Sequence, residues 1–479
     1  MCAMKYIFFV SLILLWTNSK GQPCDCRANF LYMKEKVERN YVGFADKVPP
    51  SQSSRFARFT DSLERVASDA ENRKCLGLLR AWLAYFKDLH MSMTIKDDAS
   101  NRNAIREIFS ASEKVSLSEQ AFRSYLDSNK SNLDPLEGIW EDENHVYRMG
   151  FIRDRNGKPD QFIGFILKAD SVYWMPGQVK ARIRRTGDSY QAIYYLNRDH
   201  SVFEPPIIIR QNRLSAGAFG LWFRKLPAGG DSDTITHAGT PHTAFFKVLD
   251  DRSCLLTIPG SGLDYKRAVD SIIRINQSVI QQRENLIIDL RNNSGGSVLT
   301  FEKLLPFIYT GPVINYGASV LATDDNIKYY YSQYDLPNIS DSMKNVFRRD
   351  ETELRKHEGT IYRLWPDDTL RLDKVLTYPK TVSVIINEYC ASSTELFLLQ
   401  AKQSSKVVIF GKHSAGAVDY SDAVTMKMPC ELFSLRYSTS RTNRLPAEPL
   451  DNIGIRPDIT IPDNIVNWVE FVQLKYNSH

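Results

Sequence analysis

The sequence predicts a multidomain α/β protein, and three patterns along the chain support this fold class. From Cys24 to about Leu133, apolar residues recur in steps of three and four, which indicates helices. Residues 134–227 hold short runs rich in Ile, Tyr, Phe and Val between Asn-Gly, Pro-Gly and Thr-Gly-Asp turns, which indicates antiparallel strands. From about residue 240, strand-like apolar runs alternate with amphipathic helical segments, as in α/β cores.

Composition places the chain among ordinary folded proteins. It has 479 residues, of which 43% are hydrophobic and 24% charged, enough for two or three domains with buried cores. The 61 Lys and Arg against 56 Asp and Glu give a net charge of only +5, and there is no polybasic run. We therefore expect no nucleic-acid partner.

The first residues predict export. Lys5 precedes an apolar run from Tyr6 to Trp16, and a polar stretch follows, so residues 1–21 are expected to be a signal peptide cut near Gly21. A membrane span needs about 20 apolar residues, and this run is shorter. We expect a secreted or periplasmic protein with no stable membrane insertion.

The cysteines fit an oxidising compartment but no zinc site. After the signal peptide six remain, and no spacing among them matches zinc ligation. A bridge from Cys24 or Cys26 to Cys75 is one expectation, and Cys254, Cys390 and Cys430 are expected to be buried thiols.

Three regions follow the signal peptide. Residues 22–133 are predicted to form a helical module whose second major helix ends at Lys87-Asp88-Leu89-His90. Residues 134–230 are predicted to form an antiparallel sandwich or barrel, and residues 231–479 the α/β core, with Gly229–Asp231 as a linker. Within the core, residues 320–370 are polar and aromatic and show no clear period.

Two strand-then-turn units in the core carry the candidate chemistry. In NLIIDLRNNSGGSV a buried strand ends in a turn that contains Gly295 and Gly296, where bare backbone N–H groups suit a developing anion. In TVSVIINEYCASSTELFLLQ a second strand ends at Ser392, where a helix begins. A serine nucleophile needs such a sharp turn, a base within reach and oxyanion donors, and the helix N-terminus adds partial positive charge. The structural alternative is that Ser392 only caps the helix.

These two units, in this order, resemble the S41 (tail-specific protease) family of serine peptidases. The resemblance implies a crotonase/ClpP-like α/β core and makes Ser392 the nucleophile, since it stands three residues before Glu395 as in a Ser-x-Ser-Glu-like motif. It assigns the oxyanion donors to Ser393 together with Gly295 or Gly296. The β region at 134–230 lies outside the resemblance, and it lacks a carboxylate-binding loop of the PDZ type.

The same resemblance points to a histidine base. The lysine of the Ser-Lys branch would stand where this chain has Ala417, and Lys412 does not match that place. The tricorn-like branch takes a histidine from the N-terminal region, and exported bacterial members carry it in an Asp-Gly-His-Thr motif. Asp88-Leu89-His90-Met91 resembles this motif with Leu for Gly and Met for Thr, so His90 is the candidate base. The alternative is a structural histidine at a helix end.

A carboxylate should orient the imidazole of His90. In tricorn-like enzymes it precedes a Gly-Val-x-Pro-Asp segment, which resembles residues 454–458 here, so Asp451 takes the place where glutamate is usual. The shorter side chain keeps Asp88 and Glu448 as alternatives. Ser414 comes near a G-x-S-x-G elbow, but Lys412 occupies the first glycine position and we do not interpret Ser414 as a nucleophile.

The sequence thus predicts an exported serine endopeptidase that cleaves peptide or protein substrates through an acyl-enzyme at Ser392. Metal-binding and cofactor-binding motifs are absent, so no metal or cofactor is expected. The alternative function is a non-catalytic ligand- or peptide-binding protein on the same fold, which the departures at Leu89, Met91 and Asp451 would suit. Cleavage preference and oligomeric state have no signal in the sequence.

Overall fold

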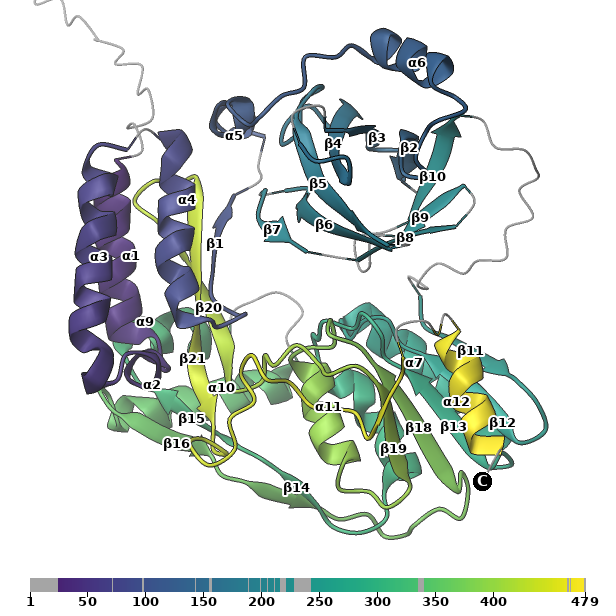
Figure 1. The fold of residues 1–479 in the computed structure, drawn as a ribbon. Coiled ribbons are helices and arrows are strands. Elements are labelled where there is room, and N and C mark those ends of the chain that lie inside the picture. The colour runs from purple at the N-terminus through teal and green to yellow at the C-terminus, as the bar shows by residue number, and fades with distance from the viewer. Residues whose placement is uncertain are drawn as a thin grey trace, which may run out of the picture.

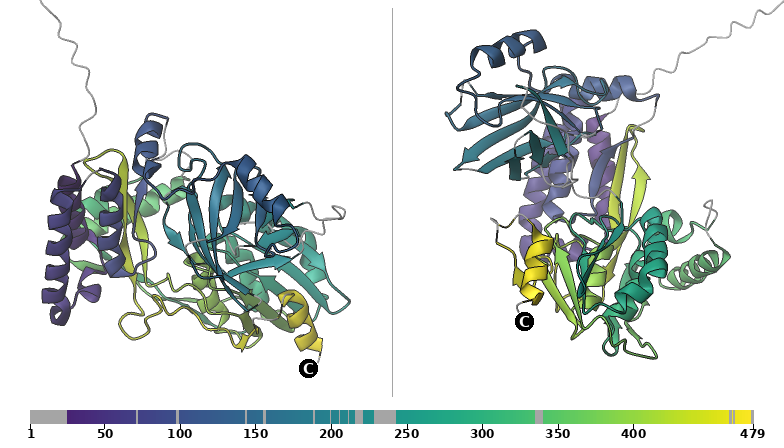
Figure 2. Two further views of the ribbon diagram at one scale, coloured as in Figure 1. Left: turned by 45° about the horizontal axis from the view of Figure 1, so that its top comes forward. Right: turned by 90° about the vertical axis from the view of Figure 1, so that its right-hand side faces the viewer.

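The computed structural model contains a helical bundle, an antiparallel barrel and an α/β core (Figure 1). It describes residues 25–477 except 71, 97–98, 143, 155–156, 188, 199, 205, 211, 216–220, 228–242, 335–339, 463–464 and 466. The expected signal peptide, Cys24 and the expected linker at Gly229–Asp231 lie outside the described residues. Two further views show the same three parts (Figure 2).

The helical bundle is built on one apolar face per helix. Its elements are α1 (Cys26–Asn40), α2 (Phe44–Lys47), a 3₁₀ turn (Pro50–Gln52), α3 (Ser53–Ser68), α4 (Asn72–Leu83) and a second 3₁₀ turn (Ala84–Phe86). Phe30, Phe56, Trp82 and Phe86 are at most 5% exposed and contact one another through their rings. Asp25 caps α1 by accepting a hydrogen bond from the N–H of Ala28, as short polar side chains do at a helix start.

The chain that leaves the bundle forms one strand of a sheet in the α/β part of the protein. After α4 the chain turns at Lys87, which is left-handed (φ 49°), and enters β1 (Ser92–Ile95). Residues 92–95 thus form a strand within a region whose sequence pattern predicts helices. They do so because their backbone groups pair antiparallel with β21 (Phe433–Thr442). This pairing carries the segment around His90 into the α/β part of the protein.

The second part is a closed antiparallel barrel. The ladder runs β5-β4-β3-β2-β10-β9-β8-β6, and β6 pairs back to β5, which closes the ring; β7 pairs with β6. The strands are β2 (Gly138–Asp142), β3 (Arg148–Arg153), β4 (Gln161–Lys168), β5 (Val179–Thr186), β6 (Ser189–Tyr195), β7 (Val202–Phe203), β8 (Pro206–Arg210), β9 (Arg213–Ser215) and β10 (Leu221–Leu226). Closure leaves few free strand edges.

Side chains fill the barrel, and two helices pack against it. Trp140, Trp174 and Lys180 are all 0% exposed, and the ammonium of Lys180 lies 4.0 Å from the ring centre of Trp174. Helix α6 (Glu119–Ser128) buries Phe122 against Phe165 of β4. Helix α5 (Arg102–Ser110) is joined to the barrel by a hydrogen bond: the backbone oxygen of Phe109 accepts from the side-chain amide of Gln178.

The core sheet has the order β11-β12-β13-β18-β19-β22 and is parallel from β12 onward. Its strands are β11 (Phe245–Val248), β12 (Ser253–Thr257), β13 (Asn285–Asp289), β18 (Thr381–Ile386), β19 (Val407–Gly411) and β22 (Ile459–Thr460). Alternate residues of a strand face opposite sides, so Ile288 and Val384 contact the helices of one face while Ile287 and Ile385 contact the other.

Helices cover both faces of this sheet. One face carries α7 (Leu263–Ile280), a 3₁₀ stretch (Val298–Leu304), α8 (Leu305–Ile308) and α11 (Ser393–Ala401). The other face carries α12 (Trp468–Asn477). Such sheets, buried on both sides, bind ligands at the carboxyl ends of their strands. The strands β13 and β18 end at the two turns that the sequence singles out.

A second sheet joins the core to the bundle. It has the order β1-β21-β15-β16, with β20 on β21, and contains β15 (Ala318–Leu321), β16 (Ile361–Trp365) and β20 (Tyr420–Lys427). The stretch without clear period also holds α9 (Asp324–Asn326), a π-helical turn (Ile327–Tyr331) and α10 (Asp341–Lys356). Strands β14 (Val313–Asn315) and β17 (Asp368–Leu370) pair separately.

The cysteines correct one expectation. Cys26 and Cys75 form a disulfide between α1 and α4, as one of the two expected pairings has it. Cys254 and Cys390 are buried thiols, as expected. Cys430 is disulfide-bonded, so the expectation of a thiol there is wrong. Its backbone N–H donates to Asn29 of α1, and this contact places the β20–β21 turn beside the start of the chain's first helix.

The described residues contain no helix that is long and apolar enough to cross a membrane.

Loss of the Cys26–Cys75 bridge should destabilise the bundle. The bond closes a loop over a sequence separation of 49 residues, and a loop of this length restricts the unfolded chain by about 4 kcal/mol at most. We expect the double variant Cys26→Ser, Cys75→Ser to lower the midpoint of the first urea unfolding transition, followed by circular dichroism. An unchanged midpoint would show that the bundle does not depend on this bond.

Candidate active site

The turn after β18 holds Ser392 in a backbone conformation that is rare for residues other than glycine. Its φ is 54° and its ψ is −119°, and α11 begins at the next residue. Such strain persists only where surrounding contacts enforce it, and it clusters at functional sites. The turn aims the Ser392 hydroxyl into a cavity and leaves the first N–H groups of α11 without helical partners.

A buried carboxylate fixes this turn. Glu395, 0% exposed, accepts hydrogen bonds from the N–H of Ser392 (3.1 Å) and the N–H of Ala417 (2.7 Å) on Oε2. Its Oε1 accepts from the hydroxyl of Ser414 (2.6 Å) and the N–H of Gly416 (2.8 Å). A buried charge is stable only when it is hydrogen-bonded in this way.

Ser414 has a structural place. It is 0% exposed, donates to Glu395, and accepts on the same oxygen from the N–H of Ile455 at 2.6 Å. Its hydroxyl therefore links the nucleophile turn to the segment around residue 455. Cys390 is equally unsuited to attack, because burial raises the pKa of its thiol to about 12.

The turn after β13 lies directly against the Ser392 turn. A Cβ on Gly295, whose φ is 96°, would lie 2.7 Å from the Cβ of Ser392 and from the backbone oxygen of Ala391. The side chains of Asn292 and Asn387 pair across the two turns, with Nδ2 of Asn387 donating to Oδ1 of Asn292 at 2.8 Å. Asn293 accepts on its backbone oxygen from the N–H of Ala391 at 3.1 Å.

Three residues were candidates for oxyanion donors, and their surroundings differ. The N–H of Gly295 already donates to Oδ1 of Asn293 at 3.1 Å. Gly296 and Ser393 both line the cavity that contains Ser392. The Ser393 N–H is one of the unpaired groups at the start of α11.

The structure brings His90 to Ser392 from 302 positions away in the sequence. Nε2 of His90 lies 3.3 Å from Oγ of Ser392. Distances of this order are usual for a base and nucleophile before substrate binds. Leu89 points outward at 58% exposure while Met91 is 8% exposed, so the two departures from the motif leave the imidazole's position intact.

Asp88 is the carboxylate beside the imidazole. Its Oδ1 accepts from the N–H of His90 at 2.8 Å and lies 3.8 Å from Nδ1 of His90. Its Oδ2 accepts from the hydroxyl of Ser438 at 3.0 Å. Nδ1 of His90 is buried and makes no hydrogen bond among the described residues, so a small rotation of the ring would bring it to Asp88.

Asp451 is not in hydrogen-bond contact with His90. Its carboxylate pairs with the ammonium of Lys47 at 2.6 Å, and its N–H donates to Asp419. Burial raises the pKa of Asp451 to about 7, although the hydrogen bond from Lys47 acts to lower it, and the neighbouring Asp88 and Asp419 raise it further. Glu448, the third candidate, is exposed, and its backbone oxygen accepts a hydrogen bond from the guanidinium of Arg444.

A cavity of about 640 Å³ opens at the His90–Ser392 pair. Its walls come from the second sheet, from the turns that follow β13 and β18, and from the stretch 320–370 that shows no clear period in the sequence. The lining residues that the sequence pattern did not single out include Tyr316, Tyr330, Trp365, Val418, Ser421, Asp422, Arg436 and Thr442. For the part of the wall that β21 forms, the sequence does offer a signal: small and polar residues alternate along this strand, which indicates one polar face.

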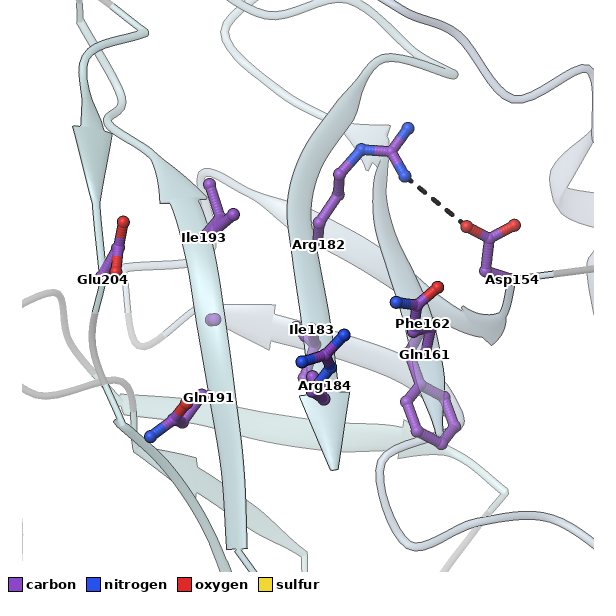
Figure 3. A pocket seen from close by; sticks show the side chains of 10 residues that line it. Asp154, Gln161, Phe162, Arg182, Ile183, Arg184, Gln191, Ile193 and Glu204 are labelled. Carbon is purple, nitrogen blue, oxygen red and sulfur yellow. Dashed lines mark ion pairs between the residues drawn. The ribbon is translucent and has the colours of Figure 1, made fainter. Parts of the chain in front are cut away.

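A second cavity of about 570 Å³ lies on the barrel, between β4, β5 and β6 (Figure 3). One of its arginines, Arg182, forms ion pairs with Glu113 at 2.5 Å and with Asp154 at 3.5 Å. The residues that line it include no nucleophile with an adjacent base, so the candidate site is the first cavity.

A serine hydroxyl at a strained strand-to-helix turn, with a histidine nitrogen beside it and backbone donors around it, defines the class of serine-type peptidases. The comparisons agree. Residues 252–461 match the model of peptidase family S41. His90 lies outside the matched range, and Ser392 lies inside it.

Individual relatives are distant. A curated protein of Chlamydia trachomatis serovar D is 24% identical over 225 residues, which is 40% of this chain and 37% of that protein. The solved structure of mature CPAF complexed with lactacystin has a TM-score of 0.50 at 13% identity and covers 95% of this chain and 96% of its own. A photosystem II D1 C-terminal processing protease has a TM-score of 0.37 at 14% identity, covering 91% and 93%. The first structure supports the fold.

Replacing Glu395 should loosen the nucleophile turn. An amide in Glu395→Gln would present N–H groups to backbone N–H donors, and each unsatisfied buried group costs about 1–3 kcal/mol. We expect a loss of about 2–4 kcal/mol in the free energy of unfolding, measured by urea titration. Glu431→Gln, an exposed site, is the matched control and should stay within error of the wild type.

Asp451 should make stability depend on pH. Its pKa is about 7 in the folded state against 3.8 for the ordinary group, so the folded protein holds a proton that the unfolded chain lacks between these values. The free energy of unfolding should fall as pH rises from about 4 to about 7, by at most about 4 kcal/mol from this group.

Urea titrations across this pH range would measure the slope in the wild type and in Asp451→Asn, where it should flatten. Asp264→Asn, whose side chain is 92% exposed, is the control and should keep the slope. A slope that persists in Asp451→Asn would assign the proton to another group.

Proposed function

We propose that this protein is an exported serine endopeptidase that hydrolyses peptide bonds through an acyl-enzyme at Ser392. The observation that carries the proposal is the 3.3 Å contact between Nε2 of His90 and Oγ of Ser392. It joins a base from the helical bundle to a nucleophile in the core. A merely structural cap at Ser392 would need neither the strained backbone nor the histidine.

In the proposed reaction, Nε2 of His90 takes the hydroxyl proton as Oγ of Ser392 attacks the peptide carbonyl. The N–H groups of Ser393 and Gly296 hold the oxyanion, helped by the positive end of α11. His90 then gives the proton to the leaving amine, and water repeats the sequence on the acyl-enzyme. The N–H of Gly295 donates to Asn293 and is not available to the oxyanion. Gly295 instead allows the two turns to pack closely against each other.

We propose Asp88, rather than Asp451, as the positioning carboxylate for His90. Asp88 lies 3.8 Å from Nδ1 and is 6% exposed, so its charge would stabilise the imidazolium that forms during attack. Asp451 is held by Lys47.

Export is part of the proposal. The apolar run at Tyr6–Trp16 is typical of a secretory signal, and the disulfides at Cys26–Cys75 and at Cys430 are typical of oxidising compartments. The alternative of a non-catalytic binding protein on this fold is less well supported. Of the three departures that favoured it, Leu89 and Met91 leave His90 in contact with Ser392, and Asp88 lies beside His90 where Asp451 does not.

The activity can be tested with an unfolded protein substrate such as casein, and with the peptides it yields. We expect Ser392→Ala to lower kcat/KM by roughly 10³-fold or more, and His90→Ala by roughly 10²- to 10⁴-fold, because each removes a group that acts in the transition state. Circular dichroism of both variants serves as the control for folding.

The pair Asp88→Asn and Asp451→Asn separates the two candidate carboxylates. We expect Asp88→Asn to reduce kcat by roughly tenfold or more, because the imidazole loses its orienting charge. Asp451→Asn should affect kcat less. The opposite order would return the positioning role to Asp451, and wild-type protein without any cleavage would favour the binding-protein alternative.

A further inference from the structure

One face of β21 forms the floor of the catalytic cavity. Successive side chains of a strand point to opposite faces, so Arg436, Ser438, Ser440 and Thr442 share one face. Ser438 donates to Asp88 and Ser440 donates to Asp422, while Arg436 and Thr442 line the cavity. The strand thus supports the catalytic histidine's carboxylate at one position and presents a guanidinium two residues away.

Register fixes how far Arg436 lies from the reaction. Its Cα pairs with that of Ser92 on β1, two residues after His90. On β21 itself, Arg436 lies two residues from Ser438, about 7 Å at a rise of about 3.3 Å per residue, and Ser438 donates to Asp88, the carboxylate beside His90. An extended peptide with its scissile bond at Ser392 would have a side chain two or three residues from that bond near Arg436.

The guanidinium is the group with unused hydrogen-bonding capacity. Arg436 is exposed and makes no ion pair or hydrogen bond among the described residues through its five N–H donors. The other charged group on the cavity wall, Asp422, accepts from the hydroxyl of Tyr330 at 2.7 Å on Oδ1 and from Ser440 on Oδ2. The cavity therefore offers a free cation and a carboxylate whose oxygens already have donors.

We propose that Arg436 is a specificity residue that binds a substrate carboxylate two or three residues from the scissile bond. Guanidinium groups bind carboxylates through two parallel hydrogen bonds, so the match is chemical as well as electrostatic. The carboxylate has two sources, an Asp or Glu side chain or the C-terminus of the substrate. This inference rests on the proposed peptidase function.

The test uses a neutral peptide found to be cleaved in the casein digest, blocked at both ends. Single Gln-to-Glu and Gln-to-Lys changes are placed at each of the three positions on either side of the cleaved bond, and a further version carries a free C-terminal carboxylate at these distances. Cleavage is measured as kcat/KM with active protein, and binding as fluorescence anisotropy with Ser392→Ala. The variants are Arg436→Gln and Arg436→Glu, with Lys427→Gln, an exposed cation of β20 outside the cavity, as the matched control.

We expect one position at which the carboxylate raises kcat/KM by roughly tenfold, the scale of a charge-assisted hydrogen bond. This ratio should fall to about one in Arg436→Gln, invert in favour of Lys in Arg436→Glu, and persist in Lys427→Gln. A response to the Glu series assigns the carboxylate to a side chain, and a response to the free terminus alone assigns it to the substrate's end.

Two results would overturn the inference: equal cleavage of all acidic and neutral peptides, or a preference for acid that survives in Arg436→Gln. A preference for Lys that disappears in Asp422→Asn would also overturn it. If no peptide is cleaved but Ser392→Ala binds the acidic peptide in an Arg436-dependent way, the peptidase proposal fails and the recognition of a carboxylate stands. If neutral peptides are cleaved and acid has no effect, only the inference about Arg436 fails.

Discussion

The hydrogen bonds to the buried carboxylate of Glu395 are the constraint on which the rest of the site depends. One side chain holds the N–H of Ser392, the hydroxyl of Ser414 and the loop N–H groups of Gly416 and Ala417. Because Ser414 also accepts from Ile455, three segments of the core meet at one charge. These contacts hold Ser392 at its positive φ, since a lone serine would relax out of it. The strain at the nucleophile is thus supported by a fully satisfied polar network.

The second requirement is that the two ends of the chain meet. The core supplies Ser392 and the backbone donors, whereas the bundle supplies His90 and Asp88 through β1, which pairs with β21. The disulfides at Cys26–Cys75 and Cys430 and the ion pair between Lys47 and Asp451 strengthen this junction. A site divided in this way is complete only when bundle and core are docked, so the stability of the junction and the geometry of the base are coupled.

Much of this could be predicted from local patterns. The strands that end at Gly295 and Ser392 were evident because a buried parallel strand is a continuous apolar run with a turn signal at its end. Short motifs predicted Ser392 and His90 as candidate residues, and the structure places their side chains 3.3 Å apart. Asp88 and Asp451 could not be ranked, because the choice depends on which carboxylate Lys47 engages, a contact across more than 400 positions. The cavity wall was missed for a similar reason: Tyr330 and Trp365 come from a stretch whose order depends on packing rather than on its own periodicity.

The central claim is that Ser392 is a nucleophile activated by His90, and covalent labelling tests it most directly. Purified mature protein would be treated with a fluorophosphonate, and the modified residue located by mass spectrometry of its peptides. We expect a single adduct on Ser392, formed at a rate that falls by roughly 10²-fold or more in His90→Ala. An adduct on another serine, or no adduct on the folded wild-type protein, would contradict it.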